Sequence, residues 1–171
     1  MRLTPIALSI AIAVATMASA GQGQRPDDQI DPNSADLVRQ SQAVLAGGQY
    51  DQATDLLETA LAIDPRNRAA YIALARVAQS QNLPGKAIRF YGRALEMEPN
   101  DVAALAGQGE ALVQRGAIER AKRNLEKIRT TCKDPCPQAM SLAAMIAKGP
   151  PQVASAQALP SLPQTQPAQK N

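Results

Sequence analysis

The middle of the chain repeats itself with a period of about 34 residues, and this period constrains the fold more than any other feature. Small, large apolar and proline positions recur in one shared register. They are Ala53, Ala87 and Ala121; Leu57, Tyr91 and Leu125; Ala60, Ala94 and Ile128; and Pro65 and Pro99. A period of this length is typical of stacked helix–turn–helix units. The sequence therefore predicts an all-α solenoid that acts as a binding scaffold and has no catalytic pocket.

Each unit divides into two expected helices. The three units cover residues 34–67, 68–101 and 102–135. The first helix of each unit should end at a residue that tolerates the left-handed backbone conformation found after helices. These residues are Gly48, Asn82 and Gly116, again one period apart. In the first two units the second helix should run to the recurring proline.

This pattern resembles the tetratricopeptide repeat family, most closely in the second unit. The residues that carry the resemblance there are Tyr71, Leu74, Ala75, Ala87, Tyr91, Ala94 and Pro99. The first unit departs from the family at Gln40 and Ser41. The third departs at Gln108 and Ile128 and has no proline in register. The resemblance implies an α-solenoid of about three repeats.

Residues 1–20 have the order of a secretory signal peptide. Arg2 precedes an apolar stretch over residues 5–17, and small residues follow up to Ala20. The apolar stretch is shorter than the roughly 20 residues that a membrane span needs. We expect cleavage before Gly21, with an uncleaved N-terminal anchor as the alternative. The mature protein would then be periplasmic or secreted, with no stable membrane insertion.

A short lead-in separates the expected signal peptide from the repeats. Residues 21–33 are rich in Gly, Pro and Asp, which predicts a flexible segment. Asn33 or Ser34 is expected to cap the first helix, because either side chain can accept from a free backbone N–H. The repeat domain is expected to cover residues 34–149.

The chain continues beyond the third repeat. Residues 137–148 carry an apolar stripe and predict a helix that caps the stack, with a partner-binding helix as the alternative. Residues 150–171 are rich in Pro and Gln and almost uncharged. They predict a disordered tail, which another protein could alternatively bind as an extended peptide.

Composition argues against several function classes. The chain has no His and no Trp, so the commonest general base and metal ligand is absent. We therefore expect no enzyme activity, no cofactor and no metal. Nucleic acid is not expected as a partner, because export and the lack of interleaved aromatic residues both argue against it.

Charge is unevenly placed along the chain. Residues 21–75 carry four Arg against eight acidic residues, whereas residues 115–148 carry eight Lys or Arg against three acidic residues. A solvated helix surface explains this simply. The alternative is a docking face for an acidic partner, peptidoglycan or an anionic lipid surface.

Two cysteines lie where the third repeat lacks its proline. Cys132 and Cys136 are separated by three residues, and an oxidising compartment favours a disulfide between them. The alternative is a redox-active pair, although the thioredoxin-type motif has a spacing of two. A zinc site is disfavoured, because two thiolates without His supply only half of a tetrahedral site.

The resemblance also implies a binding surface, since the first helix of each repeat lines the concave groove of such a stack. The six residues expected to contact a partner are Arg39, Gln42, Arg76, Gln79, Glu110 and Gln114. An apolar strip is expected beside them, formed by Val38, Ile72 and Ala106. The Lys and Asn residues of the family's carboxylate clamp are absent.

These expectations predict an exported scaffold that binds a partner protein or peptide in its concave groove. By analogy with similar short exported repeat proteins, it would assist the assembly of an envelope complex. The two alternatives are a thiol–disulfide redox protein that uses the cysteine pair and a binder of peptidoglycan or anionic surfaces.

Overall fold

The computed structural model describes residues 29–132 and 135–150, and this part of the chain contains seven helices and no strand. In chain order the helices are α2 (Pro32–Ala46), α3 (Tyr50–Ile63), α4 (Arg68–Ser80), α5 (Pro84–Met97), α6 (Val102–Gln114), α7 (Ile118–Thr131) and α8 (Pro137–Lys148). The predicted all-α fold is confirmed. All seven helices lie in one compact unit of the chain. The expected signal peptide, most of the lead-in and the tail from residue 151 lie outside the described residues.

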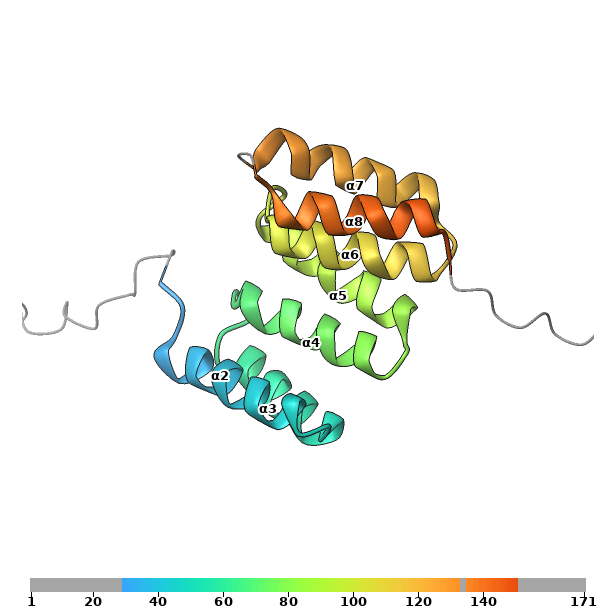
Figure 1. Cartoon of the computed structure of the whole chain (residues 1–171). Coiled ribbons are helices and arrows are strands. Elements are labelled where there is room, and N and C mark those ends of the chain that lie inside the picture. The colour runs from blue at the N-terminus through green and yellow to red at the C-terminus, as the bar shows by residue number, and fades with distance from the viewer. Residues whose placement is uncertain (1–28, 133–134, 151–171) are drawn as a thin grey trace, which may run out of the picture. The chain divides into compact units, whose positions relative to one another are not determined.

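Consecutive helices pair and then stack. α2 packs on α3, α4 on α5 and α6 on α7, and each second helix also contacts the first helix of the next pair. The first helices contact one another as well, from α2 through α4 and α6 to α8. Helices α2, α4, α6 and α8 therefore follow one another along the stack, and α3, α5 and α7 each pack against two successive members of this row (Figure 1).

The turns within the pairs form at the expected residues. Gly48, Asn82 and Gly116 have φ angles of 75°, 56° and 74°. Each therefore adopts the left-handed conformation that ends a helix and reverses the chain. The second helices α3 and α5 end two residues before Pro65 and Pro99. This position of the helix end follows because a proline disfavours the helical conformation in the residue before it.

The first helix begins earlier than the sequence suggests. α2 starts at Pro32, and Asp31 is its N-cap, accepting from the Asn33 N–H at 2.7 Å. The expectation that Asn33 or Ser34 caps this helix is therefore wrong. Ser34 is instead fully buried, and its hydroxyl donates to the Ala60 carbonyl on α3 at 2.7 Å.

A buried polar junction ties the start of the first repeat to the loop that leads into the second. The Asp64 carboxylate accepts from the Asp31 N–H at 3.0 Å, and Asn67 Nδ2 donates to Ser34 Oγ at 2.7 Å. The hydrogen bond from Asp31 is the main reason why the pKa of Asp64 lies below its usual value. These bonds fix the loop between α3 and α4 against the start of α2.

The core is built from small residues in the repeat register. Ala53, Ala60, Ala87, Ala94 and Ala121 have no exposed surface. Their small side chains let paired helices approach closely, while the larger residues between them fill the remaining space. The recurring small positions therefore have the role that the sequence predicts for them.

Helix α8 covers one end of the stack. It packs on α6 and α7, with Ala139 and Leu142 buried and Met145 and Ile146 half-buried. No helix within residues 29–132 and 135–150 is both long enough and apolar enough to span a membrane.

Candidate functional site

Four side chains from three helices meet on the side of the stack formed by the first helices. We call Arg76, Gln79, Tyr91 and Glu110 the Tyr91 cluster. Tyr91 Oη donates to Gln79 Oε1 at 2.7 Å, and Gln79 Nε2 lies 3.5 Å from the Gly107 carbonyl oxygen as a donor. Three of the four were expected from the sequence. Tyr91 was expected only as a core residue.

Gly107 makes room for the ring of Tyr91. A Cβ at this position would lie 2.3 Å from both Cζ and Oη of Tyr91, so a side chain here is incompatible with the ring position. The ring is buried, and this burial raises the pKa of the Tyr91 phenol to about 12. Tyr91 therefore keeps its proton at neutral pH and holds the Gln79 amide in one orientation.

The two charged members of the cluster differ in their surroundings. Arg76 is exposed, whereas Glu110 is half-buried. Burial raises the pKa of the Glu110 carboxyl, and the Gln79 hydrogen bond and the Arg76 charge only partly oppose this effect. Glu110 is thus a partly desolvated acid beside an accessible guanidinium. A cation or hydrogen-bond donor brought by a ligand would compensate its lost hydration.

The other three expected contact residues lie apart from this cluster. Arg39 is exposed and forms an ion pair with Asp36 on its own helix, α2. Gln42 is exposed on the same helix. Gln114 lies at the end of α6, where its Oε1 is buried and has no hydrogen-bond partner among the described residues. The structure therefore brings together the residues of the second and third repeats only.

The expected apolar strip does not form an open surface. Val38 and Ala106 are only 5% and 8% exposed, and Ile72 is half-buried against the core. These positions point toward neighbouring helices, because α2, α4 and α6 pack directly on one another. The strip is part of the core, and its prediction as a contact surface is wrong.

Gln108, which departs from the family pattern, bridges two second helices. Its Nε2 donates to the Ile88 carbonyl on α5 at 3.2 Å, and its Oε1 accepts from Asn124 Nδ2 on α7 at 3.0 Å. Asn124 also donates to the Leu105 carbonyl at 3.1 Å. The departure thus has a structural role that no local sequence signal indicates.

The two cysteines are joined at the end of α7. Cys132 and Cys136 form a disulfide with a Cα–Cα distance of 5.9 Å, within the usual range. α7 ends at Thr131, directly before the bridge, although no proline stands at the register position that follows α3 and α5. The expected disulfide is therefore formed in the structure.

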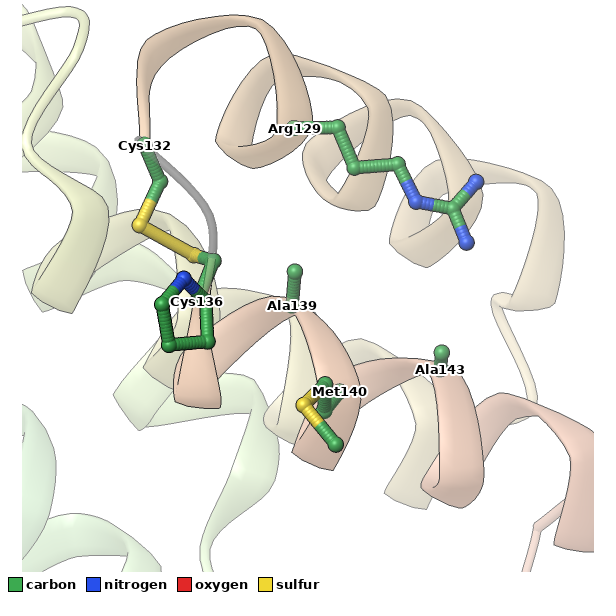
Figure 2. Close-up of a pocket in the computed structure, with 7 residues that line it drawn as sticks. Arg129, Cys132, Cys136, Ala139, Met140 and Ala143 are labelled. Atoms are coloured by element: carbon green, nitrogen blue, oxygen red, sulfur yellow. A yellow bond between two sulfur atoms is a disulfide. The ribbon is translucent and has the colours of Figure 1, made fainter.

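A cavity of about 750 Å³ lies beside this disulfide, between α7 and α8. Figure 2 shows Ala139 and Ala143 of α8 on one side, Arg129 of α7 opposite, and the disulfide at one end. Met140 is 69% exposed at its margin. Among the described residues the wall is mostly apolar, and its one charged side chain is that of Arg129. The cavity is separate from the Tyr91 cluster.

Metal ligands do not gather in the described part of the chain. Within residues 29–132 and 135–150, no group of three or more His, Cys, Asp or Glu side chains could hold a metal ion. The two cysteine sulfurs are bonded to each other.

Residues 44–90 match the tetratricopeptide repeat family. No curated protein sequence matches the chain. The helix pairs and their register agree with this match, and the described residues have the fold of tetratricopeptide repeat domains.

Solved structures with the same fold include domains from a fungus, an animal and a bacterium. The Sgt2 domain of Aspergillus fumigatus is 23% identical, with a TM-score of 0.64, over 69% of this chain and 79% of that one. The second such domain of human RPAP3, in complex with an HSP70 peptide, is 17% identical, with a TM-score of 0.61, over 67% and 95%. The Yersinia enterocolitica type III secretion chaperone SycD, in complex with a peptide of the translocator YopD, is 17% identical, with a TM-score of 0.58, over 67% and 86%.

Proposed function

We propose that this protein is an exported scaffold that binds a segment of a partner protein along the first helices of its repeats. The observation that carries the proposal is the Tyr91 cluster, in which exposed Arg76 lies beside half-buried Glu110. Two of the proteins with this fold are described with bound peptides, which supports a peptide or protein as the ligand class. The protein acts by binding and does not catalyse a reaction.

The cluster suits recognition because its geometry is fixed before a partner arrives. Tyr91 holds Gln79 in place, so little side-chain freedom is lost on binding. Arg76 offers a fork of donors for a carboxylate of the partner, and Glu110 offers an acceptor for a basic group. The segment that fits best therefore carries both charges and lies extended or helical across α4 and α6.

Export is supported by the charged, apolar and small-residue order of residues 1–20. We place the mature protein in the periplasm of a Gram-negative bacterium, where it assists assembly of an envelope complex. Sequencing of the N-terminus from an envelope fraction should begin at Gly21. An intact Met1 would contradict export by cleavage.

The binding surface can be tested by crosslinking in cells. A photoreactive residue in place of Arg76 should capture the partner, and the same residue in place of Arg123 is the matched control. Arg123 is also an exposed arginine, but it lies on α7. Capture from position 123 and not from position 76 would contradict the proposed surface.

Purified variants then measure the contribution of each charge. Arg76→Ala should weaken partner binding by about 2–5 kcal/mol, because one side of a charged contact is lost. Glu110→Gln should also weaken binding, yet its thermal stability should not fall, since burial disfavours the Glu110 carboxylate. Arg123→Ala should leave affinity nearly unchanged. Equal losses for Arg76→Ala and Arg123→Ala would indicate general charge attraction and not a defined site.

A further inference from the structure

Three arginines line a hollow of about 350 Å³ away from both sites described above. Arg89 comes from α5, Arg115 follows the end of α6, and Arg120 lies in the first turn of α7. All three residues are exposed. The hollow thus brings together basic residues from two repeats at the turn between α6 and α7.

Among the described residues, these three arginines lack the carboxylate partners that five other arginines have. Arg39, Arg66, Arg68, Arg93 and Arg129 each lie within salt-bridge distance of a carboxylate. Within residues 29–132 and 135–150, no such pair involves Arg89, Arg115 or Arg120. The nearest acidic residue in sequence, Glu119, pairs with Lys122 at 2.7 Å. The hollow therefore concentrates positive charge, which attracts anions.

The repeat register shows that an acidic residue is missing at this place. Asp51 and Glu119 lie one period either side of Gly85, and each is the acidic residue in the first turn of its helix. The first turn of α5 has no acidic residue, and Leu83 at its N-cap forms no side-chain cap. Gly85 lines the hollow, and a Cβ there would lie 3.5 Å from Arg115 Nη1. A carboxylate at this position would reach the arginines.

The rest of the lining limits the kind of anion. Ile88, Leu112 and Ala117 contribute apolar surface next to the three guanidinium groups. A bare ion would leave this surface and much of the volume unused. A phosphate carried on a small organic group would place its oxygens against the arginines, which bind phosphate in a bidentate manner, and its carbon atoms against the apolar wall.

We propose that this hollow, the tri-arginine pocket, binds the phosphate group of a small phosphate ester. The ester is either a free metabolite or the headgroup of an anionic phospholipid, and both present the same chemistry. The site is independent of the surface proposed for partner binding, because Arg76 and Glu110 do not line it.

The test uses the mature full-length chain and two probes. Glycerol 3-phosphate is titrated while amide NMR signals are followed, and vesicles of phosphatidylglycerol or phosphatidylcholine are tested by co-sedimentation. We expect saturable shifts centred on Gly85 and Arg120 with glycerol 3-phosphate, or sedimentation with phosphatidylglycerol only, or both. The first result identifies a free ester and the second a lipid headgroup. Neither saturable shifts nor lipid-selective sedimentation would overturn the proposal.

A charge-matched pair of variants separates a defined pocket from general attraction. Arg89→Gln, Arg115→Gln and Arg120→Gln together should weaken binding by about tenfold or more, because the phosphate loses its charged donors. The control, Arg123→Gln, Lys127→Gln and Lys148→Gln together, removes the same charge from exposed helix positions. It should change affinity by less than about twofold, since these residues do not line the hollow. Equal losses in the two variants would overturn the proposal.

Gly85→Glu gives a second and opposite test. It restores the acidic residue that Asp51 and Glu119 provide in the other repeats. The new carboxylate should occupy the arginines, abolish binding of glycerol 3-phosphate and raise the melting temperature. A variant that binds glycerol 3-phosphate as tightly as the unchanged protein would contradict the proposed site.

Discussion

Two faces of α6 are buried, and each has a glycine that makes room for a side chain of a neighbouring helix. The two faces differ in which side chain packs there. Gly107 faces Tyr91, and Gly109 faces Leu142 of α8. An added Cβ would lie 2.3 Å from the tyrosine ring in the first case and 2.5 Å from a leucine methyl in the second. The ring is rigid and its hydroxyl is bonded to Gln79, whereas the leucine methyl ends a flexible side chain. The two positions should therefore differ in how well they tolerate an added side chain, although both contacts are shorter than 3 Å.

Burial at one register position also differs between α6, in the middle of the stack, and α8, at its end. Ala106 on α6 is 8% exposed, while Met140, one period later on α8, is 69% exposed. α6 has α4, α5, α7 and α8 as neighbours, but α8 contacts only α6 and α7 among the described helices. The same register position is thus core in the middle of the stack and surface at its end. Position within the stack, and not the repeat pattern alone, determines how much a residue contributes to stability.

Gly107→Ala should have the largest effect. We expect it to lower the free energy of unfolding by about 2–3 kcal/mol, because the buried ring of Tyr91 cannot move aside and overpacking outweighs the higher helix propensity of alanine. Denaturant unfolding measures this loss. The Gln79–Tyr91 hydrogen bond should break as well, so the Tyr91 fluorescence or NMR signals should change. A stability equal to that of the unchanged protein would show that the ring is not confined.

Removal of the disulfide should have the second-largest effect on stability. Cys132→Ser with Cys136→Ser should cost about 1–2 kcal/mol, less than a typical bridge, because the loop it closes is very short. Hydrogen exchange should increase in α8 and in the end of α7, while the exchange of α2 to α5 stays unchanged. Faster exchange throughout the stack would show instead that the end of the stack and its middle unfold together.

Gly109→Ala should lower the free energy of unfolding by about 1–2 kcal/mol, which is less than for Gly107→Ala. The cost is smaller because Leu142 can change rotamer and α8 can shift at the open end to relieve the contact. Both changes lie on the same helix and gain the same helix propensity, so their difference reports the neighbouring side chains. Parallel denaturant titrations of the two variants provide the comparison. A larger loss for Gly109→Ala would reverse the proposed order of the two faces.

Met140→Gln should have the smallest effect, within about 0.5 kcal/mol, because the side chain is mostly exposed. Ala106→Gln at the equivalent position of α6 is the matched control. It should be strongly destabilising, since it places a larger polar group in the core. Thermal melts of both variants would check this contrast.

Much of the fold could be predicted from the sequence because it depends on local rules. The turns at Gly48 and Asn82 follow from backbone conformations that few residue types tolerate. The buried alanines follow from the repeat register, because each repeat solves the same packing problem. The first helix begins earlier than expected, since Asp31 caps it and Pro32 occupies its first turn.

The candidate site was predicted only in part. Register placed Arg76 and Glu110 on one side of the stack, and the structure brings both to Gln79 and Tyr91. Register could not show that the strip at Val38 and its equivalents is covered by neighbouring first helices.

The sequence by itself determined the helix pairs, the turns and the small residues at helix contacts, because these depend on spacing within a single repeat. Only the tertiary structure decided which of the recurring positions are open to solvent and which polar groups meet. Gln79 and Gly107 belong to different repeats, and so do Arg89 and Arg120. Their proximity depends on the angle and distance at which successive repeats pack, and these are set by side-chain volumes on several helices at once.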